Sequence, residues 1–169
     1  MGASGEVKGF NYKTEVGTNN EPNQIANLNY AICIRMDSGF CGIRYSQVDN
    51  FAFTVSGAAN GITATTVLDK NLVKVGDSAC STDYLLIPGG SETGTTQDQF
   101  YSRDRFCGTA LGYCKFTGTV GQCQNELGAV TSFAKPFIIG VVTNENEANS
   151  NANRGFFLRY SQQPCLTAG

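Results

Sequence analysis

Seven cysteines in a chain of 169 residues that lacks histidine restrict what this sequence can fold into. No two of them are separated by only two to four residues, as zinc ligands usually are, and without histidine the mixed cysteine and histidine ligand sets are absent. Scattered cysteines in a chain rich in Gly, Asn, Ser and Thr are typical of oxidising compartments. The cysteines therefore predict disulfide bonds and an extracellular protein.

Charge is sparse along the chain. Charged residues make up 15% of it, and the formal net charge is -2. Such a balance provides no basic patch for nucleic acid or for an anionic membrane surface. No apolar run approaches the roughly 20 residues that a membrane-spanning helix needs. We expect no nucleic-acid partner and no membrane insertion.

The stretch from Cys80 to Gly108 carries the strongest local pattern. An apolar strand is predicted at Asp83–Ile87, and the Pro88-Gly89-Gly90 sequence that follows predicts a break. A long polar loop then leads to Cys107.

Further β-type runs occur on both sides of this stretch. Asn29–Gln47 predicts two strands around an Asp37-Ser38-Gly39 turn, with Tyr30, Ile32 and Ile34 on one face. Later runs at Pro136–Thr143 and Gly155–Gln162 have the same character. About ten strands without a convincing amphipathic helix predict an all-β double sheet.

The chain resembles the CUB domain, an extracellular jelly-roll β-sandwich. The family's motifs are similar to Cys80 with Asp83-Tyr84-Leu85, to Phe106-Cys107-Gly108, and to the closing strand from Gly155-Phe156 to Tyr160. The Asn29–Cys41 segment and the final Gln163-Pro164-Cys165 resemble a divergent, invertebrate-type branch. The resemblance implies two roughly five-stranded, mostly antiparallel sheets joined by disulfides, with residues 1–169 as a single CUB-like domain.

The resemblance also implies a pairing of Cys80 with Cys107. Closing a loop of that length stabilises a fold by roughly 3 to 4 kcal/mol in the chain-entropy model. Cys114 and Cys123 are a second predicted pair, on the basis of their proximity alone.

Three cysteines remain, and two pairings are open for them. The jelly-roll order places the last strand antiparallel to the strand that starts at Phe40, which favours Cys41 with Cys165 and leaves Cys33 unpaired. The rival is Cys33 with Cys41 across a hairpin, which strand spacing allows.

The family usually opens with a cysteine that pairs where Cys33 stands, and this chain lacks it. Met1–Gly5 also has neither the charged start nor the apolar stretch of a signal peptide. We therefore expect an upstream segment of the full-length protein to carry a signal peptide and the missing cysteine.

Catalysis is disfavoured. Histidine, the usual general base near neutral pH, is absent, and no common serine-nucleophile motif occurs. Carboxylate pairs such as Asp98 with Asp104, or Glu126 with Glu145, would need to be brought together by the fold. We predict no enzyme activity and no cofactor.

Calcium is the one metal to consider, because many CUB domains bind it through a tyrosine and several carboxylates. This sequence offers Tyr12 and Asp83 at two of those places, but Asn144 replaces an aspartate, and the segment Val55-Ser56-Gly57 lacks the family's glutamate. Calcium prefers charged oxygen ligands. We therefore expect a severely weakened site, with Asp83 held instead by backbone hydrogen bonds or a basic side chain.

Recognition is the function that remains. Loops at Gly89–Ser102 and Asn144–Arg154 are candidates, because loops at sandwich ends commonly carry binding residues. A set of aromatic and arginine residues resembles an interface anchor: Phe100, Tyr101, Arg103 and Arg105. The alternative for Phe100 and Tyr101 is packing in the core. We expect a non-catalytic module that binds an extracellular protein, or alternatively a carbohydrate-binding jelly roll with an exposed aromatic platform.

Overall fold

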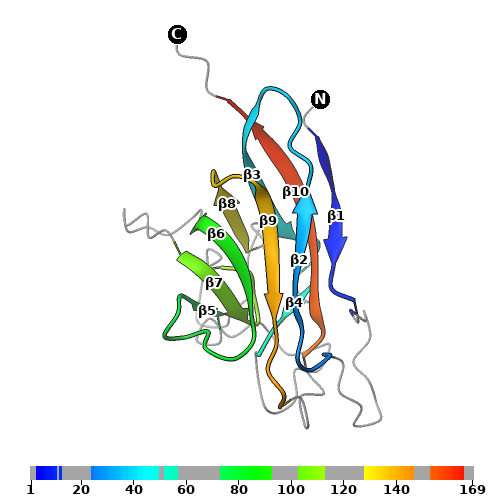
Figure 1. Cartoon of the computed structure of the whole chain (residues 1–169), viewed down its shortest axis with the longest axis vertical. Helices are drawn as coiled ribbons and strands as arrows, with labels where there is room; N and C mark the ends of the chain where they lie inside the picture. Colours follow the sequence, from blue (N-terminus) through cyan, green and yellow to red (C-terminus); the bar gives the residue numbers. More distant parts are fainter. Residues whose placement is uncertain are drawn as a thin grey trace.

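The computed structural model describes residues 3–10, 12, 24–49, 52–56, 73–92, 103–112, 128–146 and 153–165. These residues form antiparallel strands, and none of them is helical (Figure 1). The strands are β1 (Ser4–Lys8), β2 (Asn29–Ile34), β3 (Phe40–Gln47), β4 (Phe53–Thr54), β5 (Val73–Val75), β6 (Tyr84–Glu92), β7 (Arg103–Gly108), β8 (Ala129–Ser132), β9 (Phe137–Val142) and β10 (Gly155–Pro164). Within the described part of the chain there is also no helix that could cross a membrane.

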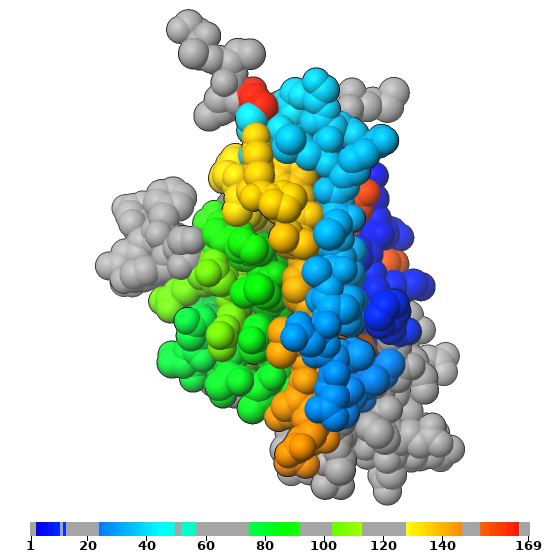
Figure 2. Space-filling view, viewed as in Figure 1, coloured from blue at the N-terminus to red at the C-terminus, as the bar shows by residue number. Residues whose placement is uncertain are grey.

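The strands form one curled sheet that folds into two facing layers. One path runs β1-β10-β3-β8-β6-β7-β5, and a second branch runs from β6 through β9 to β2. In Figure 1, β2 and β9 lie in front of β3 and β10. The space-filling view shows β2 lying against β9, with β1 next to the edge of β2 that faces away from β9 (Figure 2). The predicted all-β fold is confirmed, with the two layers joined through β6.

Strand β6 joins the layers because it changes partner along its length. Tyr84–Leu86 pairs with β9, whereas Gly90–Glu92 pairs with β8. The predicted break at Pro88-Gly89-Gly90 is therefore wrong: the strand continues, with a register shift between Leu86 and Gly90 against β7. Gly89 has φ +61°, and a Cβ at Gly90 would lie 2.8 Å from the Phe106 ring. Proline and glycine mark bulges as well as turns, and here they bend a strand.

Strands β2 and β3 do not form the predicted hairpin. The turn itself is present, since the Phe40 N–H donates to the Asp37 carbonyl at 3.3 Å and Gly39 has φ +86°. However, β2 pairs with β9, and β3 pairs with β10 and β8. The turn thus carries the chain from one layer to the other, because each strand finds its hydrogen-bond partner in a distant segment.

The core lies between the layers. In β2, the side chains of Tyr30, Ile32 and Ile34 are half-buried and point inward, as predicted, while the alternating residues are exposed. The largest fully buried side chains come from both layers: Tyr45, Phe53, Phe106, Phe137 and Phe156. Aromatic side chains of this size supply much of the apolar area that a sandwich core removes from water.

Two disulfides connect strand ends. Cys80 bonds to Cys107 on β7, with Cα atoms 5.7 Å apart, and both residues are buried in the core. Cys41 at the start of β3 bonds to Cys165 just after β10, with Cα atoms 4.7 Å apart. Both are the pairs that the resemblance favours.

The rival pairing of Cys33 with Cys41 is wrong, because β2 and β3 are not neighbours. Cys33 lies opposite Ile138 of β9 and is an exposed free thiol in this structure. It lines a groove of about 440 Å³ between β1, β2 and β10. The predicted pair of Cys114 and Cys123 lies outside the described residues.

Candidate functional site

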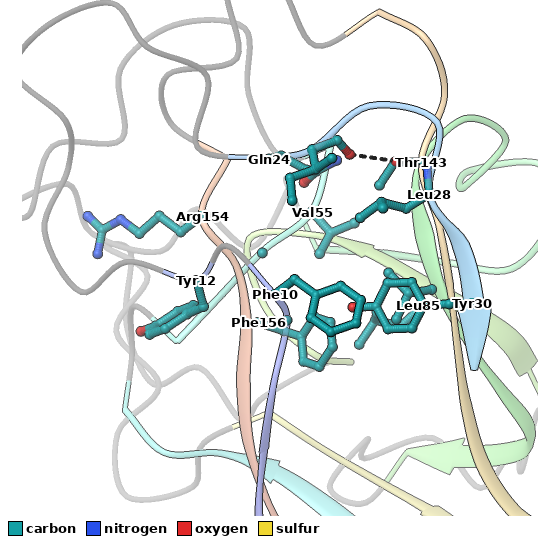
Figure 3. A pocket seen from close by; sticks show the side chains of 14 residues that line it. Phe10, Tyr12, Gln24, Leu28, Tyr30, Val55, Leu85, Thr143, Arg154 and Phe156 are labelled. Atoms are coloured by element: carbon teal, nitrogen blue, oxygen red, sulfur yellow. Dashed lines mark hydrogen bonds between the residues drawn. The ribbon is translucent and has the colours of Figure 1, made fainter. Parts of the chain in front are cut away.

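A small apolar hollow opens at one end of the two layers, where β1 and β9 end and β2 and β10 begin (Figure 3). Its floor is made by core side chains, including Leu85, Val141 and Phe156. Its volume is small, about 30 Å³. The hollow is therefore a shallow depression that exposes the edge of the core.

The wall of this hollow is tied together by Thr143. Its hydroxyl donates to the Ile25 carbonyl at 2.7 Å and accepts from the Leu28 N–H at 2.8 Å, and its own N–H donates to the Leu28 carbonyl. The neighbouring Asn27 N–H donates to the Asn144 carbonyl at 2.8 Å. These bonds fix the segment before β2 against the end of β9. The rim is therefore preorganised.

Exposed apolar side chains stand on this rim. Phe10 is 76% exposed although its ring lies 4.6 Å, centroid to centroid, from that of Tyr30. Burial raises the pKa of Tyr30, and a hydrogen bond from the Phe10 backbone partly offsets the shift. Ile25, which also lines the hollow, is 41% exposed. The hollow thus has an apolar floor and an apolar rim open to solvent.

Tyr12 and Arg154 line one side of the hollow, and their polar ends point away from Phe10 and Tyr30 (Figure 3). The Tyr12 ring lies 5.6 Å from that of Phe157. Burial raises the Tyr12 pKa, and the negative charge of Asp49 raises it further, while the positive charge of Arg154 opposes both. Arg154 is itself almost fully buried. Tyr12 therefore keeps its proton at neutral pH and can donate a hydrogen bond at this edge.

Two of the three predicted calcium ligands, Asp83 and Asn144, contact each other through a hydrogen bond. A carboxylate oxygen of Asp83 accepts the Asn144 N–H at 2.8 Å, and the Asn144 side chain accepts the Asn146 N–H at 2.8 Å. Tyr12 has Asp49 and Arg154 as its charged neighbours. Within the described ranges, no group of three or more Asp, Glu, Cys or His side chains is placed to hold a metal ion. Asp83 has the backbone partner that the sequence favoured over a metal.

Arg103 and Arg105, the described members of the predicted anchor set, contact other parts of the domain. The Arg105 guanidinium pairs with Asp77 at 3.2 Å, donates to the Cys80 carbonyl, and lies 4.4 Å from the Tyr84 ring centre. Arg105 therefore fastens the turn before β6 to the sheet. One guanidinium nitrogen of Arg103 lies close to Gly76. Phe100 and Tyr101 lie outside the described residues.

The two candidate loops begin and end at opposite ends of the layers. Glu92 and Arg103, which flank the first loop, lie at the far end of β6 from Tyr84. Thr143, just before the second loop, and Arg154, at its end, line the hollow. The described ends of the second loop therefore adjoin this site.

Each carboxylate pair considered for catalysis has only one member among the described residues, Asp104 in the first pair and Glu145 in the second. Asp104 accepts a hydrogen bond from the Gly89 N–H at 2.8 Å. Asp98 and Glu126, one member of each pair, lie outside the described ranges.

Sequence reasoning missed the residues that form the hollow. The sequence pattern predicts Tyr30 on one face of a strand, and it predicts no binding role for Phe10. The available signal was the pair of aromatics on two segments that begin or end next to polar loops. That signal is weak, because only the tertiary fold brings these segments together.

Comparison with known proteins places these features in a family. Residues 1–163 match the family model described as "Animal CUB domain". No curated protein and no solved structure is matched. Since the match extends over nearly the whole length, in agreement with the curled antiparallel sheet and its two disulfides, the chain belongs to the animal CUB domain family.

Proposed function

We propose that this CUB domain is an extracellular recognition module that binds a protein partner at the end of the layers where the apolar hollow opens. In this proposal Phe10 and Ile25 are the apolar anchors, and Tyr12 supplies a hydrogen-bond donor. The second candidate loop, between Asn144 and Arg154, borders the same surface.

The family supports the general part of this proposal. CUB domains are non-catalytic and generally act as extracellular protein-interaction modules. The two disulfides are consistent with an oxidising compartment.

The observation that carries the specific part is the exposure of Phe10. The Phe10 side chain is 76% exposed beside a hollow whose floor belongs to the core. A partner that covers this side chain removes its apolar surface from water, which favours binding. Interface hot spots are large side chains, often aromatic, near the centre of the contact, where a partner shields them from water. The preorganised wall around Thr143 lowers the entropy that binding must overcome.

The test compares two exposed phenylalanines. The domain, attached through a tag after Cys165 at the end of β10 away from the hollow, is used to isolate binding proteins from extracellular fluid. Each identified protein is then titrated against the wild type, Phe10→Ala and Phe133→Ala. We expect Phe10→Ala to weaken binding about 30-fold, as for a hot-spot residue worth about 2 kcal/mol. Equal affinities for Phe10→Ala and wild type would refute the site.

A carbohydrate-binding role requires an exposed aromatic platform. Phe133 provides one candidate, being 62% exposed at the opposite end of β9 from the hollow. The carbohydrate-binding role is therefore supported by Phe133, which lies on a surface separate from the hollow.

A further inference from the structure

Phe133 is an exposed aromatic ring that lies directly on the sheet. Its ring covers Gly42 of β3, so closely that a Cβ at Gly42 would lie 2.7 Å from two ring carbons. The residue nevertheless remains 62% exposed. Glycine at position 42 therefore lets the ring rest on the backbone while much of it faces solvent.

The backbone that carries this ring is held on both sides. The Ser132 hydroxyl donates to the Pro88 carbonyl and accepts the Ala134 N–H at 3.1 Å. Ser132 itself is buried and pairs with Ile43 of β3. Phe133 is thus fixed between two anchored residues, and its exposure is a property of the fold.

A row of polar side chains runs across the sheet beside this ring. Because Ile43 and Tyr45 of β3 point into the core, Arg44 between them points outward. The strand registers place Ser161 of β10 and Thr131 of β8 directly opposite Arg44 on the same face. The row continues one strand further on each side, to Ser4 of β1 and Ser91 of β6. At about 4.8 Å per strand, this row extends for about 19 Å.

The charge of this face is opposite to that of the whole chain. On the outward face of β1, β10 and β3, the strand residues include three cations, Lys8, Arg44 and Arg159, and one anion, Glu6. Glu6 pairs with Arg159 at 3.3 Å, and Arg44 has no ion pair among the described residues. The chain as a whole has a net charge of -2. An anion would therefore be attracted to this face in particular.

We infer that this outer face of β1, β10, β3 and β8 binds an acidic glycan. Phe133 offers a ring on which the C–H face of a sugar can stack, and Arg44 offers a guanidinium that can hold a carboxylate or sulfate by paired hydrogen bonds. The serine and threonine hydroxyls beside Arg44 both donate and accept, as sugar hydroxyls do. An acidic peptide would use the arginine but has no need of a hydroxyl row or a fixed aromatic ring.

The experiment titrates the intact domain with defined oligosaccharides by calorimetry. The probes are a heparin hexasaccharide, a hyaluronan hexasaccharide and neutral maltohexaose, with a hexaglutamate peptide as the protein-like anion. We expect one or both acidic glycans to bind, maltohexaose to bind at least tenfold more weakly, and binding to weaken as salt is raised, because exposed charges are screened.

Matched variants separate this face from the rest of the surface. Phe133→Ala and Arg44→Gln should each weaken glycan binding about tenfold, whereas Phe133→Tyr should retain it. Phe10→Ala and Arg35→Gln are the controls, since Phe10 lies at the hollow and the exposed Arg35 follows β2 in the other layer. Melting temperatures of all variants establish that folding is retained.

Three results would overturn the inference. These are the absence of binding to both acidic glycans, equal losses in the control variants, and hexaglutamate binding as tightly with the same dependence on Arg44. The last result would assign the face to an acidic protein segment. None of them bears on the hollow, because its test depends on Phe10.

Discussion

The carboxylate of Asp83 accepts a hydrogen bond from the backbone N–H of Asn144, 61 residues further along the chain. It joins the start of β6 to the residue that follows Thr143 at the end of β9. Asp83 is only 5% exposed, so the bond is shielded from water. The side chain that a calcium site would use is instead part of the structure that holds the rim of the hollow in place.

Replacing Asp83 should therefore destabilise the domain. We expect Asp83→Ala to lower the free energy of unfolding by about 2 kcal/mol, since hydrogen bonds to charged groups contribute about 1.5 to 3 kcal/mol. Asp83→Asn, which keeps an acceptor oxygen, should lose less. Urea unfolding measures both. A wild-type midpoint for Asp83→Ala would contradict the structural role of this bond.

Calcium should have little effect on stability. Ligands that bind only the folded state raise the melting temperature, so millimolar calcium should shift the melting temperature of a domain with an intact site. We expect the melting temperature in millimolar calcium to equal that in a chelator, with magnesium as the control. An increase that is specific for calcium and is lost in Asp83→Asn would show that the ion binds there.

The Cys80–Cys107 disulfide should contribute strongly to stability. It links residues 27 positions apart, for which the chain-entropy model gives about 3.6 kcal/mol. The double variant Cys80→Ala/Cys107→Ala should lose at least this amount, because removing two buried sulfur atoms also leaves a cavity.

The exposed Cys33 provides the matched control for this prediction. Cys33→Ser should change the free energy of unfolding by less than about 0.5 kcal/mol, as is usual at the surface. In the native wild type, a thiol reagent should label Cys33 and leave Cys80 and Cys107 unmodified. A large loss of stability in Cys33→Ser would be inconsistent with its exposed position on β2.

Tyr45 should make stability depend on alkaline pH. Burial raises its pKa in the folded state, and the neighbouring Tyr160 adds to the shift. An unfolded tyrosine ionises near pH 10. The stabilisation is therefore complete below that pH, and it is lost as pH rises towards the higher folded-state value.

The variant Tyr45→Phe tests this expectation. Among the described residues the Tyr45 hydroxyl has no hydrogen-bond partner, so its removal should increase the free energy of unfolding at neutral pH by about 1 kcal/mol. The loss of stability above about pH 10 should also become shallower. Urea unfolding over a pH series checks both, and curves identical to wild type would contradict the prediction.

The sequence was sufficient to predict several of the strands and some of their faces. Tyr30, Ile32 and Ile34 alternate with exposed residues because side chains on a strand point to opposite sides, and this pattern is local. The pairing of Cys80 with Cys107 could be predicted from the resemblance to a family. The bulge at Gly89 could not, since proline and glycine have the same local preferences in a bulge and in a turn.

The amino-acid sequence by itself determined that the chain is extended, disulfide-forming and poor in charge, because backbone preference, thiol chemistry and composition belong to the residues. Only the tertiary structure decided that β2 pairs with β9, that the Phe10 side chain stands beside the hollow, and that Phe133 rests on Gly42. The physical reason is that backbone hydrogen bonds are nearly the same for every residue type. The choice of strand partner, and hence of which apolar side chains stay in water, depends on how distant segments pack together.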